Sequence, residues 1–255
     1  MRQAVVTGKL VSTMSAMRHP LGLLRLLLLL GVALAVAVLL AACGSGSSEP
    51  TDEEGRELLE RILLTVEDVP AGLQPGGSVF TTNEEAAEAA DNPNTELSRF
   101  EIWGRILGYR AVFVPGPDAS PRMVVGVEAE VTLFGDSAGA RFWFDDRVAQ
   151  ARAQLDAAQA GTAGALTDME VTEIDAQVIA PNAYWIRTSG FETEEPVSLR
   201  VDNQVLFLVA EVAVFLRVDV VVQGVSDRTF FATEFTQLAQ LMHERLTAEF
   251  AAGDP

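Results

Sequence analysis

The stretch MVVGVEAEVTLF, residues Met123 to Phe134, predicts a strand with one buried and one solvated face. Its apolar side chains from Val125 to Val131 occupy alternate positions and share one face, whereas Glu128, Glu130 and Thr132 share the other. Such alternation is typical of an antiparallel sheet that is covered on one side only. The sequence therefore predicts an antiparallel sheet with a polar face.

The residues on either side of this strand predict the elements packed around it. Tyr109 to Val114 forms a second strand, and the Pro- and Gly-rich loop Pro115 to Pro121 joins the two strands in a hairpin. Asp136 or Ser137 begins a helix whose apolar stripe we expect to lie on the sheet. The stripe comprises Ala140, Trp143, Phe144, Val148, Ala151 and Leu155.

The chain before the hairpin predicts two short helices separated by loops. Thr51 and Glu54 form a capping box for an amphipathic helix that ends near Thr65. The loop that follows contains Val69-Pro70-Ala71-Gly72 and then Pro75-Gly76-Gly77. Thr82 or Asn83 caps an acidic helix that runs to Ala90, where Asn92-Pro93 ends it.

The second half of the chain repeats the order of strands followed by a helix. Strands are expected at 170–179, 183–191, 197–201 and 205–222, and a turn at Asp202-Asn203 joins the last two. The strand 205–222 is long enough to be bent or split, and Asp227 begins the final helix. Each half thus ends in a strand, a turn and an aromatic-rich helix, through duplication or through a common unit that occurs twice. We expect an α+β fold, an antiparallel sheet with amphipathic helices packed against it, as one domain from 51 to 255 with halves of about 51–160 and 165–255.

The sequence Leu40-Ala41-Ala42-Cys43 closes an uncharged apolar run that begins at Leu26 and follows Arg18 and Arg25. This order of basic, apolar and small residues is typical of an export signal, and its end resembles the lipobox of bacterial lipoproteins. The resemblance implies that residues 1–42 are removed as a signal peptide and that Cys43 is acylated. A simple membrane-anchoring helix is the alternative, but the apolar run is a little shorter than the roughly 20 residues that a spanning helix needs.

Composition limits the partners and the location of the mature chain. Four of the 18 basic residues precede Cys43 and all 36 acidic residues follow it, which leaves a net charge of about −22. Such a surface repels nucleic acid and anionic lipid headgroups, so the lipid on Cys43 is the expected link to the membrane. Residues 43–50 then form a flexible tether between the lipid and the domain. The export signal places the domain on the extracytoplasmic side. No disulfide is expected, because Cys43 is the only cysteine.

Catalytic groups are scarce after Cys43. His243 is the only histidine there, and no Gly-x-Ser-x-Gly elbow or phosphate-binding loop follows a predicted strand. Glu128 and Glu130 project from one strand face about 7 Å apart, a spacing that suits paired carboxylates, although pairing with Arg217 or Arg200 on a solvated face explains them better. We therefore expect no enzyme activity, no metal and no cofactor.

Two aromatic residues in one strand give the candidate ligand contacts. Tyr184 and Trp185 are followed by Arg187, and a strand directs neighbouring side chains to opposite faces. One of the two aromatic rings is therefore expected to be exposed, and we treat Tyr184, Trp185 and Arg187 as speculative binding residues.

The segment LLTVEDVPAGL, residues Leu63 to Leu73, together with the two strand-to-helix units, resembles exported actinobacterial lipoproteins and kinase sensor domains of the PsbP-like class. The resemblance implies a non-catalytic binding or sensory-accessory domain that uses a groove between its sheet and helices. An envelope protein or a small apolar ligand is the implied partner. Two alternatives remain: a lipid carrier in which the strand 205–222 curves around an apolar cavity, and an envelope hydrolase that uses its acidic residues.

Overall fold

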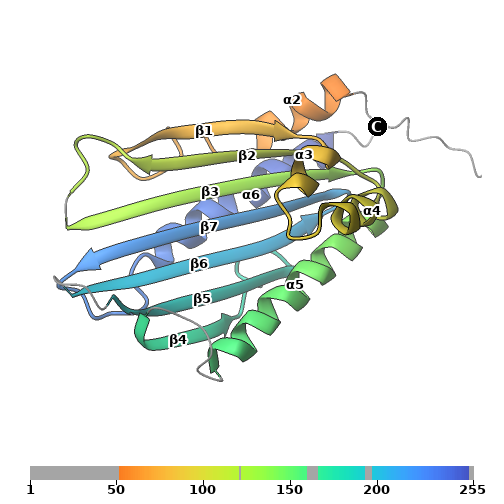
Figure 1. Cartoon of the computed structure of the whole chain (residues 1–255). Helices are drawn as coiled ribbons and strands as arrows, with labels where there is room; N and C mark the ends of the chain where they lie inside the picture. Colours follow the sequence, from red (N-terminus) through yellow and green to blue (C-terminus); the bar gives the residue numbers. More distant parts are fainter. Residues whose placement is uncertain (1–51, 121, 160–165, 193–196, 253–255) are drawn as a thin grey trace, which may run out of the picture. The chain divides into compact units, whose positions relative to one another are not determined.

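The computed structural model describes residues 52–120, 122–159, 166–192 and 197–252 (Figure 1). The predicted signal peptide, Cys43 and the tether up to residue 50 lie outside the described residues. The described part contains α2 (Asp52–Ile62), β1 (Leu73–Thr81), α3 (Asn83–Glu88), α4 (Pro93–Trp103), β2 (Arg105–Pro115), β3 (Met123–Phe134), α5 (Ser137–Gln159), β4 (Leu166–Ile174), β5 (Ala183–Glu192), β6 (Ser198–Val209), β7 (Val212–Gln223) and α6 (Ala232–Ala252).

The strands form one antiparallel sheet of seven strands in the order β1-β2-β3-β7-β6-β5-β4, and five helices pack against it. The α+β class and the β2–β3 hairpin are thereby confirmed. Strand β3 has the predicted bounds, and it pairs with β2 on one side and with β7 on the other. Strand β3 therefore lies near the middle of the sheet.

The alternation of β3 divides the sheet into two faces. We call the face that bears Val125, Val127 and the following odd-numbered residues of β3 the core face; α2 and α6 cover it. The groove face bears Glu128 and Glu130, and α5 lies across part of it together with α3 and α4. Figure 1 shows α6 behind the sheet and α5 in front of it.

The two strand-to-helix units end on opposite faces. Strand β3 leads to α5 on the groove face, whereas β7 leads to α6 on the core face. A duplication would relate the antiparallel neighbours β3 and β7 by a twofold axis normal to the sheet. Rotation about such an axis would leave both helices on the same face. The arrangement therefore favours a common unit that occurs twice over a duplication.

The predicted turn at Asp202-Asn203 is wrong. Strand β6 continues through both residues to Val209, and the turn falls at Ala210 and Glu211, where Ala210 has a φ of 51°. Asp202 is held inside the strand by an ion pair with Arg217 of β7. The expected strand 205–222 is split, as one of the two predicted forms, into the end of β6 and β7, which pair as a hairpin.

Several boundaries near proline and glycine also differ from the predictions. Pro75 to Gly77 belongs to edge strand β1 as a bulge, and Pro93 begins helix α4 with Asn92 as its N-cap. Proline is compatible with both places, because the first turn of a helix and a strand edge need no N–H donor there. Thr82, one of the two predicted caps, is the N-cap of α3, and it forms a capping box with Glu85. Strand β4 begins and ends before the predicted 170–179, and α6 begins at Ala232 rather than at Asp227.

Candidate functional site

A groove runs along α5 where this helix crosses the groove face. It consists of three adjoining cavities of about 600, 240 and 280 Å³. The first two share Arg147 and Gln150, and the last two share Gln154 and Gln204. The shared residues place the three cavities next to one another along α5, and we call them together the groove.

The helical spacing of α5 explains how one helix lines the whole groove. Arg147, Gln150, Gln154 and Ala158 follow one another at intervals of three or four residues and therefore share one side of the helix. At a rise of 1.5 Å per residue, this side extends over about 16 Å. The groove is therefore long and narrow.

Apolar side chains of the sheet form the floor of the groove. Leu206 of β6 and Phe215 of β7 lie under its middle, and Val171 and Ile186 lie under the end towards β4. Polar side chains at the walls include four amides, two guanidinium groups and three carboxylates: Asn92, Gln150, Gln154, Gln204, Arg99, Arg147, Asp91, Glu96 and Glu130. The groove thus combines an apolar floor with walls that donate and accept hydrogen bonds, as ligand pockets commonly do.

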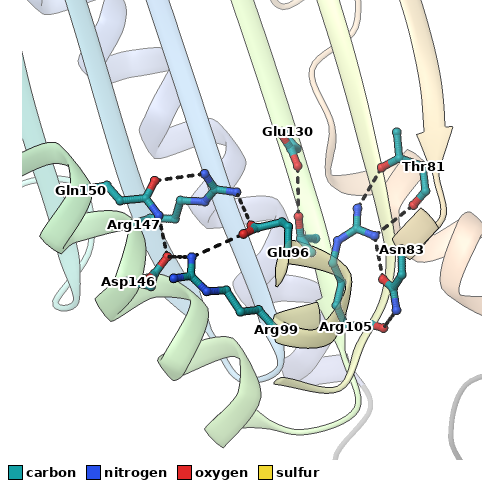
Figure 2. Close-up of polar contacts among 10 residues, drawn as sticks. Thr81, Asn83, Glu96, Arg99, Arg105, Glu130, Asp146, Arg147 and Gln150 are labelled. Atoms are coloured by element: carbon teal, nitrogen blue, oxygen red, sulfur yellow. Dashed lines mark hydrogen bonds and ion pairs between the residues drawn. The ribbon is translucent and has the colours of Figure 1, made fainter. Parts of the chain in front are cut away.

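Arg147 links the groove to the helix pair α4 and α5 (Figure 2). Its Nη2 lies 3.6 Å from Glu96 Oε1, its Nη1 donates to Gln150 Oε1 at 3.4 Å, and its guanidinium carbon lies 5.4 Å from the centre of the Trp143 ring. Gln150 in turn donates to Asp146 at 2.6 Å. This network fixes the position of a partly exposed cation at the mouth of the groove.

Arg105 is a buried cation next to this network, and sequence reasoning did not identify it. It is 5% exposed and donates to the carbonyl and hydroxyl oxygens of Thr81 at 3.2 and 2.8 Å and to Asn83 Oδ1 at 2.9 Å (Figure 2). Its guanidinium carbon lies 5.0 Å from the centre of the Phe100 ring. Burial lowers the pKa of Arg105, and the nearby charge of Glu130 opposes this effect. Asn83 returns a hydrogen bond to the Arg105 carbonyl oxygen at 2.9 Å, so Arg105 joins β1 and α3 to the start of β2.

The absence of a side chain at Gly108 could have pointed to Arg105. A Cβ atom at this position would overlap Arg105 Nη2 and lie 2.8 Å from Thr81 Oγ1. The glycine inside an otherwise apolar strand therefore leaves room for the guanidinium.

The part of the groove face that α5 leaves open carries a charge ladder, which we define as Arg110, Glu128, Arg217, Asp202, Asp219 and Arg200. Arg110 Nε lies 2.6 Å from Glu128 Oε1. Arg217 donates to both carboxylate oxygens of Asp202 at 3.0 and 2.9 Å, and Arg200 Nε donates to Asp219 at 2.9 Å. The hydrogen bond to Asp202 raises the pKa of Arg217, and burial opposes this effect. The ladder explains how a sheet face without a helix above it stays stable in water.

The two carboxylates considered for catalysis have different surroundings. Glu128 belongs to the charge ladder and lies opposite Arg217 in the register, whereas Glu130 lines the groove and accepts a hydrogen bond from Thr132 at 3.4 Å. Arginine pairing is found for Glu128, but the ion pair is with Arg110 and not with the expected Arg217 or Arg200.

The structure does not bring the three sequence-predicted binding residues together. Tyr184 lies on the groove face beneath α5, whereas Trp185 and Arg187 lie on the core face. Tyr184 and Trp185 are 6% and 5% exposed, so the expected exposure of one ring is wrong. Both faces are covered by a helix at this strand, which the sequence of the strand alone does not show. Burial raises the pKa of Tyr184, and the nearby charge of Glu173 adds to this effect.

Trp185 and Arg187 contact a buried amide instead of solvent. Trp185 Nε1 and Arg187 Nε both donate to Asn203 Oδ1, at 3.2 and 2.9 Å, and Asn203 is fully buried. Burial lowers the pKa of Arg187, and the charge of Asp227 opposes this effect. These residues therefore form a polar contact within the core.

Other predicted sites can be placed only in part. His243 lies on α6 with its ring edge towards Phe207 at a centroid distance of 5.8 Å. Within residues 52–252, apart from the undescribed gaps, no group of three or more His, Cys, Asp or Glu side chains could hold a metal ion. In the same part of the chain, no helix is long and apolar enough to cross a membrane. The predicted acylation site, Cys43, lies outside this part.

Comparisons with known proteins show a likeness to solved structures but none to a protein family. No protein-family model matches the sequence, and no curated protein matches it. The chain is similar to the crystal structure of the extracellular domain of PknH from Mycobacterium tuberculosis, with a TM-score of 0.47 and 12% sequence identity over 75% of this chain and 96% of that one. At this level the likeness concerns the arrangement of elements, and the function has to be inferred from the groove.

Proposed function

We propose that this chain is a lipid-anchored bacterial lipoprotein with a non-catalytic extracytoplasmic domain that binds a ligand in the groove along α5. The observation that carries the proposal is the groove itself, in which three cavities adjoin under one side of a helix. The export-type N-terminus and the sequence around Cys43 support the location. The domain would act as a binding or sensory-accessory module at the cell membrane.

The lining indicates the chemistry of the ligand. Gln150, Gln154 and Gln204 offer amide donors and acceptors along the groove, and Arg147 adds one cation at its mouth. Leu206 and Phe215 supply an apolar floor. An elongated amphipathic molecule fits this lining, with its apolar side on the floor and its polar groups hydrogen-bonded to the walls.

Occlusion of the groove tests the proposal. Gln154 lines two of the cavities, so that Gln154→Trp should fill the middle of the groove. Ala153 is exposed on the same helix and lines none of the three cavities, which makes Ala153→Trp the matched control. Native mass spectrometry of the acylated full chain, extracted from its host membrane, should show a bound small molecule that Gln154→Trp loses and Ala153→Trp retains.

Two results would count against the proposal. A spectrum without any bound molecule in the parental protein, or with equal binding in both tryptophan variants, would remove the groove as the binding site. The intact mass of the same preparation reports the anchor, because Cys43→Ser should lose the mass of the acyl groups. An unchanged N-terminal modification in Cys43→Ser would contradict acylation at this residue.

A further inference from the structure

Two large apolar side chains are exposed at the end of the domain where α4 ends and α5 begins. Ile102 of α4 is 80% exposed and Phe142 of α5 is 61% exposed. Both values are high for apolar side chains, because the exposure of apolar surface to water is unfavourable. We call these two residues the apolar tip.

Close backbone contacts place Ile102 and Phe142 at the same end of the sheet. A Cβ atom at Gly139, in the first turn of α5, would overlap the carbonyl oxygen of Trp103 at the end of α4. Gly135 donates to the carbonyl oxygen of Gly104 at 2.8 Å just after β3 ends. Ile102 directly precedes the first of these contacts, and Phe142 lies one helical turn beyond it.

The described domain also begins at this end. A Cβ atom at Gly55, in the first turn of α2, would lie 3.1 Å from Leu133 Cδ2, next to the last residue of β3. Figure 1 shows the start of α2, the helix α4 and the first turns of α5 at the same end of the sheet. The chain therefore enters the domain beside the apolar tip.

The length of chain before α2 limits the distance between this end and the anchor. Nine residue steps separate Cys43 from Asp52, and even a fully extended chain spans at most about 3.6 Å per residue, or roughly 32 Å. The opposite end of the sheet lies about 34 Å further along β3, given ten residue steps from Val124 to Phe134 at 3.4 Å each. The end with the apolar tip can therefore meet the membrane without extension of the tether, whereas the opposite end could do so only with the tether almost fully extended along the sheet.

We propose that the apolar tip inserts into the lipid surface to which Cys43 is anchored, so that the domain stands on the membrane through Ile102 and Phe142 as well as through its tether. This inference rests on the acylation of Cys43 in the proposed function. Glu101 and Arg141 flank the tip with opposite charges, and the mature chain is strongly acidic, so zwitterionic lipid is the surface that it would meet without repulsion. Contact at the tip would orient the groove relative to the membrane.

A fluorescent reporter beside the tip tests this orientation. Glu101 is exposed and directly precedes Ile102, so that Glu101→Cys can carry a nitrobenzoxadiazole label. Acylation blocks Cys43, the only native cysteine. The matched control label is at Val124→Cys, which is also exposed but lies at the opposite end of β3. In phosphatidylcholine vesicles that carry the acylated full chain, aqueous dithionite should reduce the label at 101 several-fold more slowly than the label at 124.

The double variant Ile102→Ser/Phe142→Ser identifies the cause of the protection. Both side chains are exposed, so the variant should keep the parental circular dichroism and melting temperature, and it should still float with the vesicles through its acyl chains. The label at 101 should then react as fast as the label at 124.

Three outcomes would overturn the inference. The first is an equal rate of dithionite reduction for the labels at 101 and 124 in the parental protein, and the second is protection of the label at 101 that survives in the double serine variant. The third is protection of this label in native membranes but not in pure lipid vesicles, which would indicate a protein partner. A chain that carries no acyl group by intact mass would instead contradict the anchor of the proposed function. Failure of the anchor and failure of the tip contact are thus measured separately.

Discussion

The two faces of the sheet are formed by the same strands but differ in how deeply their side chains are buried. On the core face, Leu216 and its neighbours from alternate positions of β7 are fully buried against α2 and α6. On the groove face, the intervening residues include Phe215, Arg217 and Asp219, which are only partly buried. One strand therefore supplies a dry core and a wet binding surface from adjacent positions.

The difference shows where the sequence of this domain can change at low cost. Close packing on the core face penalises any change in volume, whereas the part of the groove face that α5 leaves open pairs its charges in the charge ladder. A surface of this kind can expose a groove without exposing a large apolar patch that would favour aggregation. We expect stability to come from the core face and binding to come from the groove face.

The largest expected effect is a loss of stability that differs between two neighbouring residues of β7. Leu216→Ala leaves a cavity in the core and should lower the free energy of unfolding by about 2–5 kcal/mol. Phe215→Ala removes a larger side chain from the groove floor but should cost less, because this side chain is only partly buried. Urea unfolding of both variants checks the order, and an equal or larger loss for Phe215→Ala would contradict the assignment of the two faces.

A smaller effect concerns the ion pair on the core face that joins α6 to the loop after α2. Arg245 of α6 donates to both carboxylate oxygens of Asp68, at 2.9 and 2.7 Å, and also to the carbonyl oxygen of Leu63 at 3.1 Å. Burial raises the pKa of Asp68, but the hydrogen bonds from Arg245 and Thr65 outweigh it and leave the pKa below its ordinary value. Asp68→Asn should therefore lower the free energy of unfolding by about 1–3 kcal/mol at neutral pH.

The pH dependence of the same variant gives an independent measurement. Because the pKa of Asp68 is lower in the folded chain, its stabilisation is complete above the unfolded pKa of about 3.9 and is lost as the pH falls through the folded value. The difference between the parental protein and Asp68→Asn should thus shrink below about pH 4. A constant difference down to pH 2 would show that the carboxylate charge does not matter at this position.

The smallest expected effect concerns the charge ladder of the groove face. Asp202→Asn weakens the pair with Arg217, whose side chain is 39% exposed, and it also removes one of two negative charges that face each other in the register, Asp202 and Asp219. Solvent screening and this relief of repulsion should limit the loss to about 1 kcal/mol or less. Thermal unfolding at low and high salt checks the effect, and a loss as large as that of Asp68→Asn would mean that the ladder contributes to stability as strongly as the core-face ion pair.

Local patterns in the sequence were sufficient for part of the fold. The alternation in β3 predicted its bounds and its two faces, and the cap residue at Thr82 or Asn83 predicted the start of α3. Both signals lie within a few residues of the element that they define. Signals of this range do not depend on the rest of the chain.

Elements that depend on distant partners were placed wrongly. Asp202 and Asn203 have the residue types of a turn, but contacts with Arg217, Trp185 and Arg187 on the neighbouring strands keep them inside β6. The burial of Tyr184 and Trp185 depends in the same way on the helices above and below β5. A strand shows which residues share a face, but it does not show what covers that face.

The sequence by itself determined the α+β class, the alternation that separates the two faces, the acidic charge and the motif around Cys43, because each of these follows from residue types and short spacings. Only the tertiary structure decided that α5 and α6 lie on opposite faces, that α5 forms a groove with residues of five strands, and that Ile102 and Phe142 lie beside the start of the domain. The physical reason is that packing and ion pairing join residues far apart in the chain, and such contacts leave no regular spacing in the sequence.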